Sequence, residues 1–101
     1  TEVERDAEKM KKAEYMENKI GEEYEGIVSS ITQFGMFVEL ENTVEGLIRF
    51  ENMGDEYFIY DEERKILIGE RTNKTYKIGD KVQIRVIRAD KQLREIDFEL
   101  M

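Results

Sequence analysis

The chain has 101 residues, which is enough for one domain. It has no cysteine, which excludes disulfides and thiolate metal sites. It also has no histidine, the commonest general base of enzymes. No apolar run approaches the length of a membrane span and no signal-peptide pattern opens the chain, so we expect a cytoplasmic protein without a membrane partner. Taken whole, the formal net charge of −8 argues against a nucleic-acid partner.

The first predicted element is a helix over residues 1–19. Apolar side chains recur there at helical spacing, and Gly21 is expected to stop the helix. The stripe consists of Val3, Ala7, Met10, Ala13 or Tyr15, Met16 and Ile20. A narrow apolar stripe on a charged helix needs a partner surface, which is either the rest of this chain or a domain outside it. Because the chain does not begin with Met, we expect a piece of a longer protein and favour the outside domain.

From Tyr24 onward the apolar residues recur with a period of two, which indicates strands. Five strands are expected, at residues 24–32, 35–41, 44–50, 81–89 and 94–100. Tight turns are expected at Asn42-Thr43, between the second and third strands, and at 91–93, between the last two. Five antiparallel strands with alternating faces suit a small closed barrel, because closure removes the open edges.

The second of these strands shows the most informative pattern. Alternation places Met36 and Val38 on one face of the strand and Phe37 on the other, with Phe34 just before the strand. In an arbitrary β-domain both phenylalanines would be assigned to the core. The outward position of Phe37 instead favours an aromatic surface of the kind on which single-stranded nucleic acids stack.

Residues 51–80 are too many for a plain loop in a compact domain, so we expect a short helix or a small hairpin there. Residues 65–70 and 75–78 could pair across 71–74 as such a hairpin. The segment also holds three aromatic residues that make it a candidate protein-docking surface, namely Tyr57, Phe58 and Tyr60. A protein–protein adaptor that presents this segment is therefore a second hypothesis for the function.

The last two strands lie in the basic part of the chain. Residues 64–101 carry ten basic and six acidic residues, whereas the middle of the chain is strongly acidic. A solvated face is the ordinary explanation of such bases, and contact with a nucleic-acid backbone is the functional one. Among the bases of these strands we favour Arg94 for that contact, and then Lys81 and Arg85.

Several motifs follow one another in the order that one family shows: Gly26-x-Val28-x-x-Ile31-x-x-Phe34-Gly35-Met36-Phe37-Val38-x-Leu40, Glu45-Gly46-Leu47-Ile48, Ile78-Gly79-Asp80-Lys81-Val82 and Asp90-x-x-x-Arg94. Together they resemble the S-one-type RNA-binding domain over residues 21–101. The resemblance implies an all-β fold, a five-stranded antiparallel OB-fold barrel with an N-terminal α-helix and a long insertion between strands three and four. It also implies that the domain binds single-stranded RNA.

Other segments are similar to the C-terminal region of the bacterial ribonuclease R family: Glu4-Arg5-Asp6-Ala7-Glu8, Tyr15-Met16-x-x-x-Ile20-Gly21-Glu22-Glu23-Tyr24, and Asp61-Glu62 through Gly69-Glu70-Arg71-Thr72 to Tyr76. Members of that family are 3′→5′ exoribonucleases whose catalytic domain holds magnesium with aspartates. The resemblance implies that residues 1–20 are the tail of such a catalytic domain and that residues 21–101 are its RNA-gripping module. We expect no catalytic site and no cofactor in this chain itself.

The resemblance also implies which residues contact RNA. By motif these are two phenylalanines, a residue late in the third strand, and an Asp and an Arg around the last turn: Phe34, Phe37, Arg49, Asp90 and Arg94. Many members have His where this chain has Arg49, and Arg keeps the cation and can stack on a base. From its position, Asp90 is first a turn residue whose side chain caps the following backbone. With Lys81 and Arg85 these residues form the predicted RNA site. Two alternative functions stay open, a protein–protein adaptor and a translation-related RNA-binding module.

Overall fold

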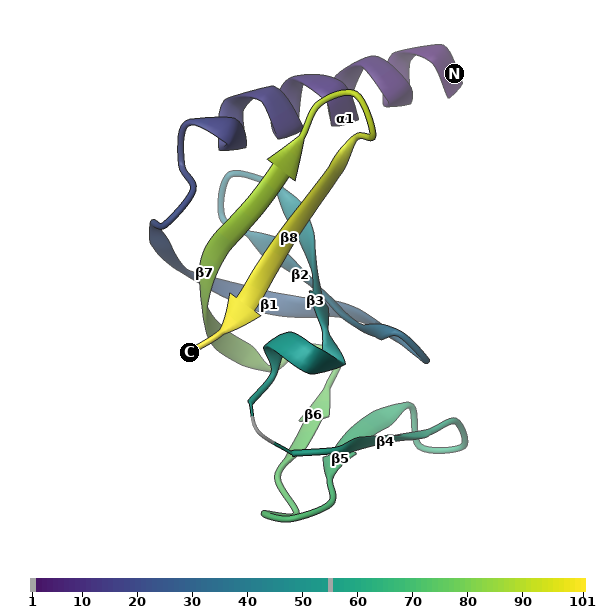
Figure 1. The fold of residues 1–101 in the computed structure, drawn as a ribbon. Helices are drawn as coiled ribbons and strands as arrows, with labels where there is room; N and C mark the ends of the chain where they lie inside the picture. Colours follow the sequence, from purple (N-terminus) through teal and green to yellow (C-terminus); the bar gives the residue numbers. More distant parts are fainter. Residues whose placement is uncertain (1, 55) are drawn as a thin grey trace.

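The structure, a computed structural model, describes residues 2–54 and 56–101. Its elements in chain order are α1 (Glu2–Glu17), β1 (Glu23–Thr32), β2 (Gly35–Leu40), β3 (Glu45–Arg49), a 3-10 turn η1 (Phe50–Asn52), β4 (Phe58–Asp61), β5 (Ile66–Gly69), β6 (Thr75–Lys77), β7 (Lys81–Asp90) and β8 (Glu95–Leu100) (Figure 1). The five expected barrel strands are all present, and each end lies within one residue of its predicted position.

Strands β1, β2, β3, β8 and β7 close into a barrel in that order, which confirms the all-β fold class. Four neighbouring pairs are antiparallel, but β3 and β8 run parallel, so the expectation of a wholly antiparallel barrel is wrong for this pair. The reason is geometric. Strand direction cannot alternate all the way around a ring that has an odd number of strands, so one pair must be parallel.

The barrel encloses a core of inward-facing side chains at alternate strand positions. The largest fully buried ones from the barrel strands are Phe98, Met36, Ile48, Ile84, Val28, Val38 and Val86. The Phe98 ring passes so close to Gly46 that a Cβ at that position would collide with the ring. Gly46 on β3 therefore makes room for the central aromatic residue of the core.

Helix α1 lies across one end of the barrel, beside the turn between β7 and β8 (Figure 1). It ends at Glu17, two residues before its predicted end, and its predicted first residue, Thr1, lies outside the described residues. Ala13 and Met16 are both 0% exposed and belong to the barrel's core cluster. The preference for a partner domain outside the chain is therefore wrong for these two residues, because the barrel itself covers them. Met10 and Ile20 of the predicted stripe are exposed. No helix in the described part of the chain is long and apolar enough to cross a membrane.

The insertion between β3 and β7 forms a three-stranded antiparallel sheet in the order β4-β5-β6, at the end of the barrel opposite α1 (Figure 1). The predicted hairpin is confirmed, since β5 pairs with β6 and Leu67 lies opposite Tyr76. Strand β4 was not expected. It pairs with β5, and the Phe58 ring lies beside the Tyr76 ring in the same core cluster as Leu67, which is continuous with the core of the barrel.

Candidate nucleic-acid interface

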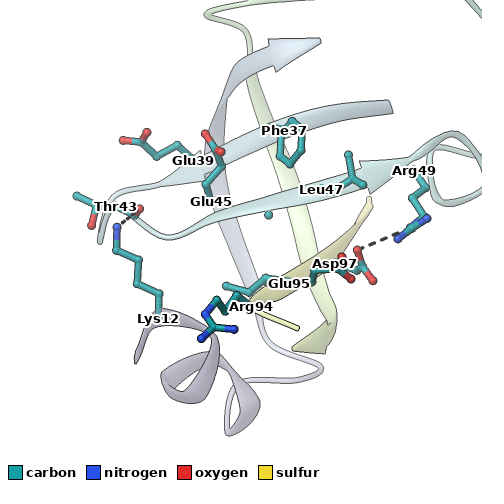
Figure 2. Close-up of a pocket in the computed structure, with 12 residues that line it drawn as sticks. Lys12, Phe37, Glu39, Thr43, Glu45, Leu47, Arg49, Arg94, Glu95 and Asp97 are labelled. Carbon is teal, nitrogen blue, oxygen red and sulfur yellow. Dashed lines mark hydrogen bonds and ion pairs between the residues drawn. The ribbon is translucent and has the colours of Figure 1, made fainter. Parts of the chain in front are cut away.

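A cleft of about 390 Å³ crosses the outer faces of β2, β3 and β8. Three residues of the predicted site line it, namely Phe37, Arg49 and Arg94 (Figure 2). The other lining residues are Lys12, Glu39, Thr43, Glu45, Gly46, Leu47, Glu95, Ile96 and Asp97. The barrel thus brings residues from α1, from three strands and from the last turn to one surface.

The floor of the cleft is a row of outward residues in register on three adjacent strands. Phe37 on β2 lies opposite Leu47 on β3, and Leu47 lies opposite Asp97 on β8. Met36 and Val38, the neighbours of Phe37 in sequence, are buried, so the predicted alternation of β2 is confirmed. The half-buried Phe37 ring is outside the core and, with Leu47, offers an apolar surface to a ligand in the cleft.

Phe34 occupies a different place, in the turn between β1 and β2. Its side chain is 67% exposed, and its backbone N–H donates to the hydroxyl of Thr32 at 3.1 Å. The next residue, Gly35, has φ +153°, and a Cβ there would collide with the carbonyl oxygen of Ile48. This close approach of β2 to β3 requires glycine. It leaves Phe34 on the exposed turn, away from the residues that line the cleft.

Asp97 is one of the residues of this surface that the sequence analysis missed. Alternation along β8 places it on the outer face with Glu95 and Glu99, but it is only 6% exposed. Its carboxylate lies 3.8 Å from Nε of Arg49 and accepts a hydrogen bond of 2.8 Å from Nη1 of Arg88. That hydrogen bond is the main reason why the pKa of Arg88 is raised. The carboxylate therefore links Arg49, at the cleft, to β7.

Arg94 is presented by the turn between β7 and β8. Asp90 caps this turn, because its Oδ1 accepts the backbone N–H groups of Gln92 at 2.9 Å and Leu93 at 3.1 Å. The capping role predicted for Asp90 is confirmed. Arg94 itself has φ +55°, in the left-handed region, and its Nη1 donates to the carbonyl of Gln92 at 3.2 Å. The turn geometry thus directs the arginine side chain to the cleft.

Lys81 and Arg85 do not line this cleft. Both lie on β7, which borders β1 and β8 in the barrel and pairs with neither β2 nor β3. Arg85 donates to the carboxylates of Glu23 at 3.1 Å and Glu99 at 3.0 Å, and these partners raise its pKa. Lys81 instead lines a separate hollow that also contains Glu25. Alternation correctly assigned both residues to the outer surface, but it does not tell which side of the barrel they occupy.

The charges around the cleft are arranged unevenly. Lys12 and Arg94 lie at the end near α1, and Arg49 lies at the other end (Figure 2). Glu39 and Glu45 face each other across β2 and β3, and the Glu45 carboxylate accepts a hydrogen bond of 2.6 Å from Ser29. The cleft therefore combines a short apolar floor with positive groups at its ends and four carboxylates, those of Glu39, Glu45, Glu95 and Asp97, and it is not a uniformly basic groove.

The three aromatic residues proposed for protein docking do not form one surface. Phe58 is 6% exposed and belongs to the core, so assigning it to a docking surface is wrong. Tyr60 is partly buried against the same core, and Tyr57 is 79% exposed. Among the described residues no group of carboxylates has the arrangement of a metal site.

The sequence and the structure of this chain are similar to those of known proteins. The profile of the S1 RNA binding domain matches residues 17–100. Ribonuclease R 1 of Lactococcus lactis subsp. lactis is 54% identical over 98% of this chain, and Ribonuclease R of Ureaplasma parvum is 48% identical over 98%. The chain spans only 12% and 14% of the length of these two proteins. The solved structure of Mycoplasma genitalium RNase R in complex with ribose-methylated single-stranded RNA superposes with a TM-score of 0.91 at 32% identity, over 97% of this chain and 15% of that one.

Proposed function

Because this chain belongs to the S1 RNA-binding domain family, we propose that it binds single-stranded RNA in the cleft across β2, β3 and β8, with little sequence preference. One observation carries the proposal: Phe37 lies outside the core, on the floor of a cleft that has cationic side chains at both ends. An exposed aromatic face with flanking cations is the arrangement that binds single strands, because every base has a face that can stack.

In this proposal, bases stack on Phe37, and Leu47 extends the apolar floor beside it. Arg49 and Arg94 donate to phosphate oxygens or stack on bases, and Asp97 holds Arg49 in place. Phe34, on its exposed turn, offers a second stacking surface outside the cleft.

The other predicted residues take smaller parts in the proposal. Asp90 supports the turn that presents Arg94. Lys81 meets only RNA that extends beyond the cleft. Arg85 contributes least, because two carboxylates already occupy its guanidinium.

The names of the relatives support a proposal about the protein to which such a module belongs. We propose that this chain holds RNA for a 3′→5′ exoribonuclease of the cytoplasm, whose magnesium-dependent catalytic domain degrades it. Residues 1–20 would then connect that catalytic domain to the S1 domain at residues 21–101. Since Ala13 and Met16 are buried against the barrel, the connecting helix would be fixed to the module it joins.

A nuclear magnetic resonance titration of the chain with a single-stranded hexaribonucleotide tests the RNA proposal. We expect the largest shifts of amide and side-chain signals at Phe37, Leu47, Arg49 and Asp97, because base rings stacked on the floor change the local magnetic environment. If the signals of the cleft stay unchanged at saturating RNA, the cleft is not the binding site.

A protein-docking function remains the second candidate, and one observation favours it. Tyr57 is 79% exposed, and Ile59 on β4, the edge strand of the small sheet, is 53% exposed. Edge strands with exposed apolar residues are common contact sites for other chains. In the same titration, protein docking predicts that RNA leaves the signals of the cleft residues unchanged. It predicts shifts of the signals of Tyr57 and Ile59 only when a protein partner is added.

A further inference from the structure

Helix α1 contributes a residue to the cleft although most of it precedes the region that matches the S1 family. The match begins at residue 17, and Lys12 lies more than one helical turn before that point. Lys12 nevertheless lines the same cleft as Phe37 and Arg94. The binding surface thus includes a cation that the barrel alone does not supply.

The position of Lys12 is fixed by the packing of the residues that follow it in α1 and by a hydrogen bond of its own side chain. The next residue, Ala13, and Met16 one turn later are fully buried against the barrel. The Lys12 ammonium itself donates to the backbone carbonyl of Thr43, in the turn between β2 and β3, at 3.2 Å. An ammonium group has three N–H donors, so this bond leaves it able to donate to a ligand as well.

The same helix is also bonded to the turn that presents Arg94. The Glu17 carboxylate accepts the backbone N–H of Lys91 at 3.2 Å. Lys12 and Arg94 therefore come from two segments that are held together, and Figure 2 shows both at the α1 end of the cleft. Two cations at one confined end raise the electrostatic potential there, which favours an anion that accepts hydrogen bonds from both.

Carboxylates that line the cleft oppose this effect. Glu95 is paired with Nη1 of Arg88 at 3.4 Å, but Arg88 is also paired with Asp97. Glu39 and Glu45 line the cleft too, and the hydrogen bond that Glu45 accepts from the neutral Ser29 hydroxyl leaves its charge in place. A phosphate at the α1 end thus meets two basic side chains, and the glutamates limit the gain in affinity that these bases give.

We propose that α1 is part of the RNA-binding surface and that Lys12, together with Arg94, binds a backbone phosphate of single-stranded RNA at the α1 end of the cleft. The inference rests on the proposed function and adds to it a binding residue outside the S1 match. It also means that bound RNA bridges the helix and the barrel, so RNA stabilises the docking of α1.

The salt dependence of RNA binding tests this inference. The affinity of the full chain for fluorescent oligo(A) and oligo(U) is measured between 0.1 M and 1 M salt for the unchanged protein and three variants, Lys12→Gln, Lys12→Arg and Lys11→Gln. Each phosphate contact contributes about 0.7 to the slope of log affinity against log salt for single strands. Lys12→Gln should therefore reduce the slope by about 0.7 and weaken binding about fivefold at 0.1 M salt, equally for both sequences.

The other variants are matched controls. Lys12→Arg keeps the cation and should keep the slope of the unchanged protein. Lys11 is exposed on the same helix and does not line the cleft, so Lys11→Gln should have no effect on the slope. An equal loss in Lys11→Gln and Lys12→Gln would overturn the inference, because it would reflect only the overall charge of the helix.

Failure of the inference and failure of the proposed function give different results. If Lys12→Gln binds RNA with an unchanged slope while Phe37→Ala loses affinity, the RNA cleft stands and the role of Lys12 is refuted. If the unchanged protein does not bind either oligonucleotide, both the proposed function and the inference are refuted.

Discussion

Asp97 shows how a buried charge can serve an exposed site. Taking a carboxylate out of water is unfavourable unless charged partners and hydrogen bonds compensate. Arg88 and Arg49 provide this compensation from opposite sides of the strand, at 2.8 Å and 3.8 Å. The guanidinium of Arg49 is thereby held at the edge of the cleft, where it is still 46% exposed and available to a ligand.

We predict that Asp97→Asn lowers both stability and RNA affinity. The amide keeps the shape but loses the charge. Its one oxygen can accept from only one of the two arginines, so its NH₂ group, a donor, faces the other guanidinium. The expected loss in the free energy of unfolding is about 1.5–3 kcal/mol, the range for hydrogen bonds to charged groups. Chemical denaturation measures it. Glu95→Gln is the control, because this exposed partner of Arg88 should change stability by less than about 1 kcal/mol. Equal effects of the two substitutions would contradict the role given to Asp97.

Among single residues, the sequence predicts Phe37 and Arg94 but not Asp97 or Lys12. A phenylalanine in an outward strand position is conspicuous, because water-facing positions are usually polar. An aspartate or a lysine in such a position is ordinary. Only the pairing of β3 with β8 and the packing of α1 place these two residues beside the cleft, and neither contact is encoded in a local pattern.

Two residues of helix α1, Ala13 and Met16, belong to the barrel's core, although the helix was expected to pack on another domain. We predict that Met16→Ala lowers the free energy of unfolding by about 2–5 kcal/mol, because Met16 is fully buried and the substitution leaves a cavity. Tyr15→Ala is the control on the same helix, and this 53% exposed residue should change stability by less than about 1 kcal/mol. Thermal or chemical denaturation distinguishes the two. If Met16→Ala unfolds like the unchanged chain, the helix does not pack on the barrel in solution.

The turn between β5 and β6 is bonded to a carboxylate from the segment before β4, in addition to its own backbone hydrogen bonds. Glu56 accepts the backbone N–H groups of Arg71 and Thr72, each at 3.0 Å, and the Thr72 hydroxyl at 2.8 Å. These hydrogen bonds, above all the one from the Thr72 backbone, lower the pKa of Glu56. Since the folded pKa lies below the unfolded one, the stabilisation is complete above the ordinary pKa of a glutamate and is lost as the pH falls through the lowered value.

We therefore predict that this turn loosens in acid before the barrel unfolds. The amide hydrogen exchange of Arg71 and Thr72, corrected for the intrinsic effect of pH, should accelerate as the pH falls through the lowered pKa of Glu56. In Glu56→Gln, which has no titrating group at this position, the acceleration should be absent. If the variant and the unchanged chain show the same pH dependence, the carboxylate does not control the turn.

Among the elements, the five barrel strands and the β5–β6 hairpin were predictable, because alternation and turn residues are local signals. Strand β4 and the parallel pairing of β3 with β8 were not. The residues of β4 show no clean alternation that would mark them as a strand, and the strand is stabilised by Phe58 packing against Leu67 and Tyr76. Strand order depends on contacts between distant segments, which the pattern within each segment does not specify.

For the chain as a whole, the net charge of −8 limits how strongly electrostatics can contribute to RNA binding. We predict a shallow salt dependence. Among the residues whose side chains the structure describes, three cations line the cleft, so the slope of log affinity against log salt should be no steeper than about −2. Fluorescence titrations of a short oligoribonucleotide at several salt concentrations measure it. A slope near −5 would mean that bases outside the cleft neutralise most of the phosphates.

The sequence indicated which part of the chain is basic, but it did not indicate how the barrel distributes those bases. Arg85 and Arg88 lie in the basic C-terminal part, and the barrel turns both toward carboxylates of neighbouring strands. The cleft instead receives cations from three separate segments, α1, β3 and the last turn. The charge of a segment is therefore a weaker guide to the binding surface than the register of the strands.

Binding of a single-stranded oligoribonucleotide to Phe37→Ala tests the stacking surface most directly. Removing the ring should weaken binding by about 1–3 kcal/mol, the contribution of one base stacked on an aromatic side chain. Tyr57→Ala is the matched control, because it removes an exposed aromatic residue that does not line the cleft, and its affinity should equal that of the unchanged chain. A folded Phe37→Ala variant that binds RNA as tightly as the unchanged chain would contradict the assignment of the cleft as the RNA-binding site.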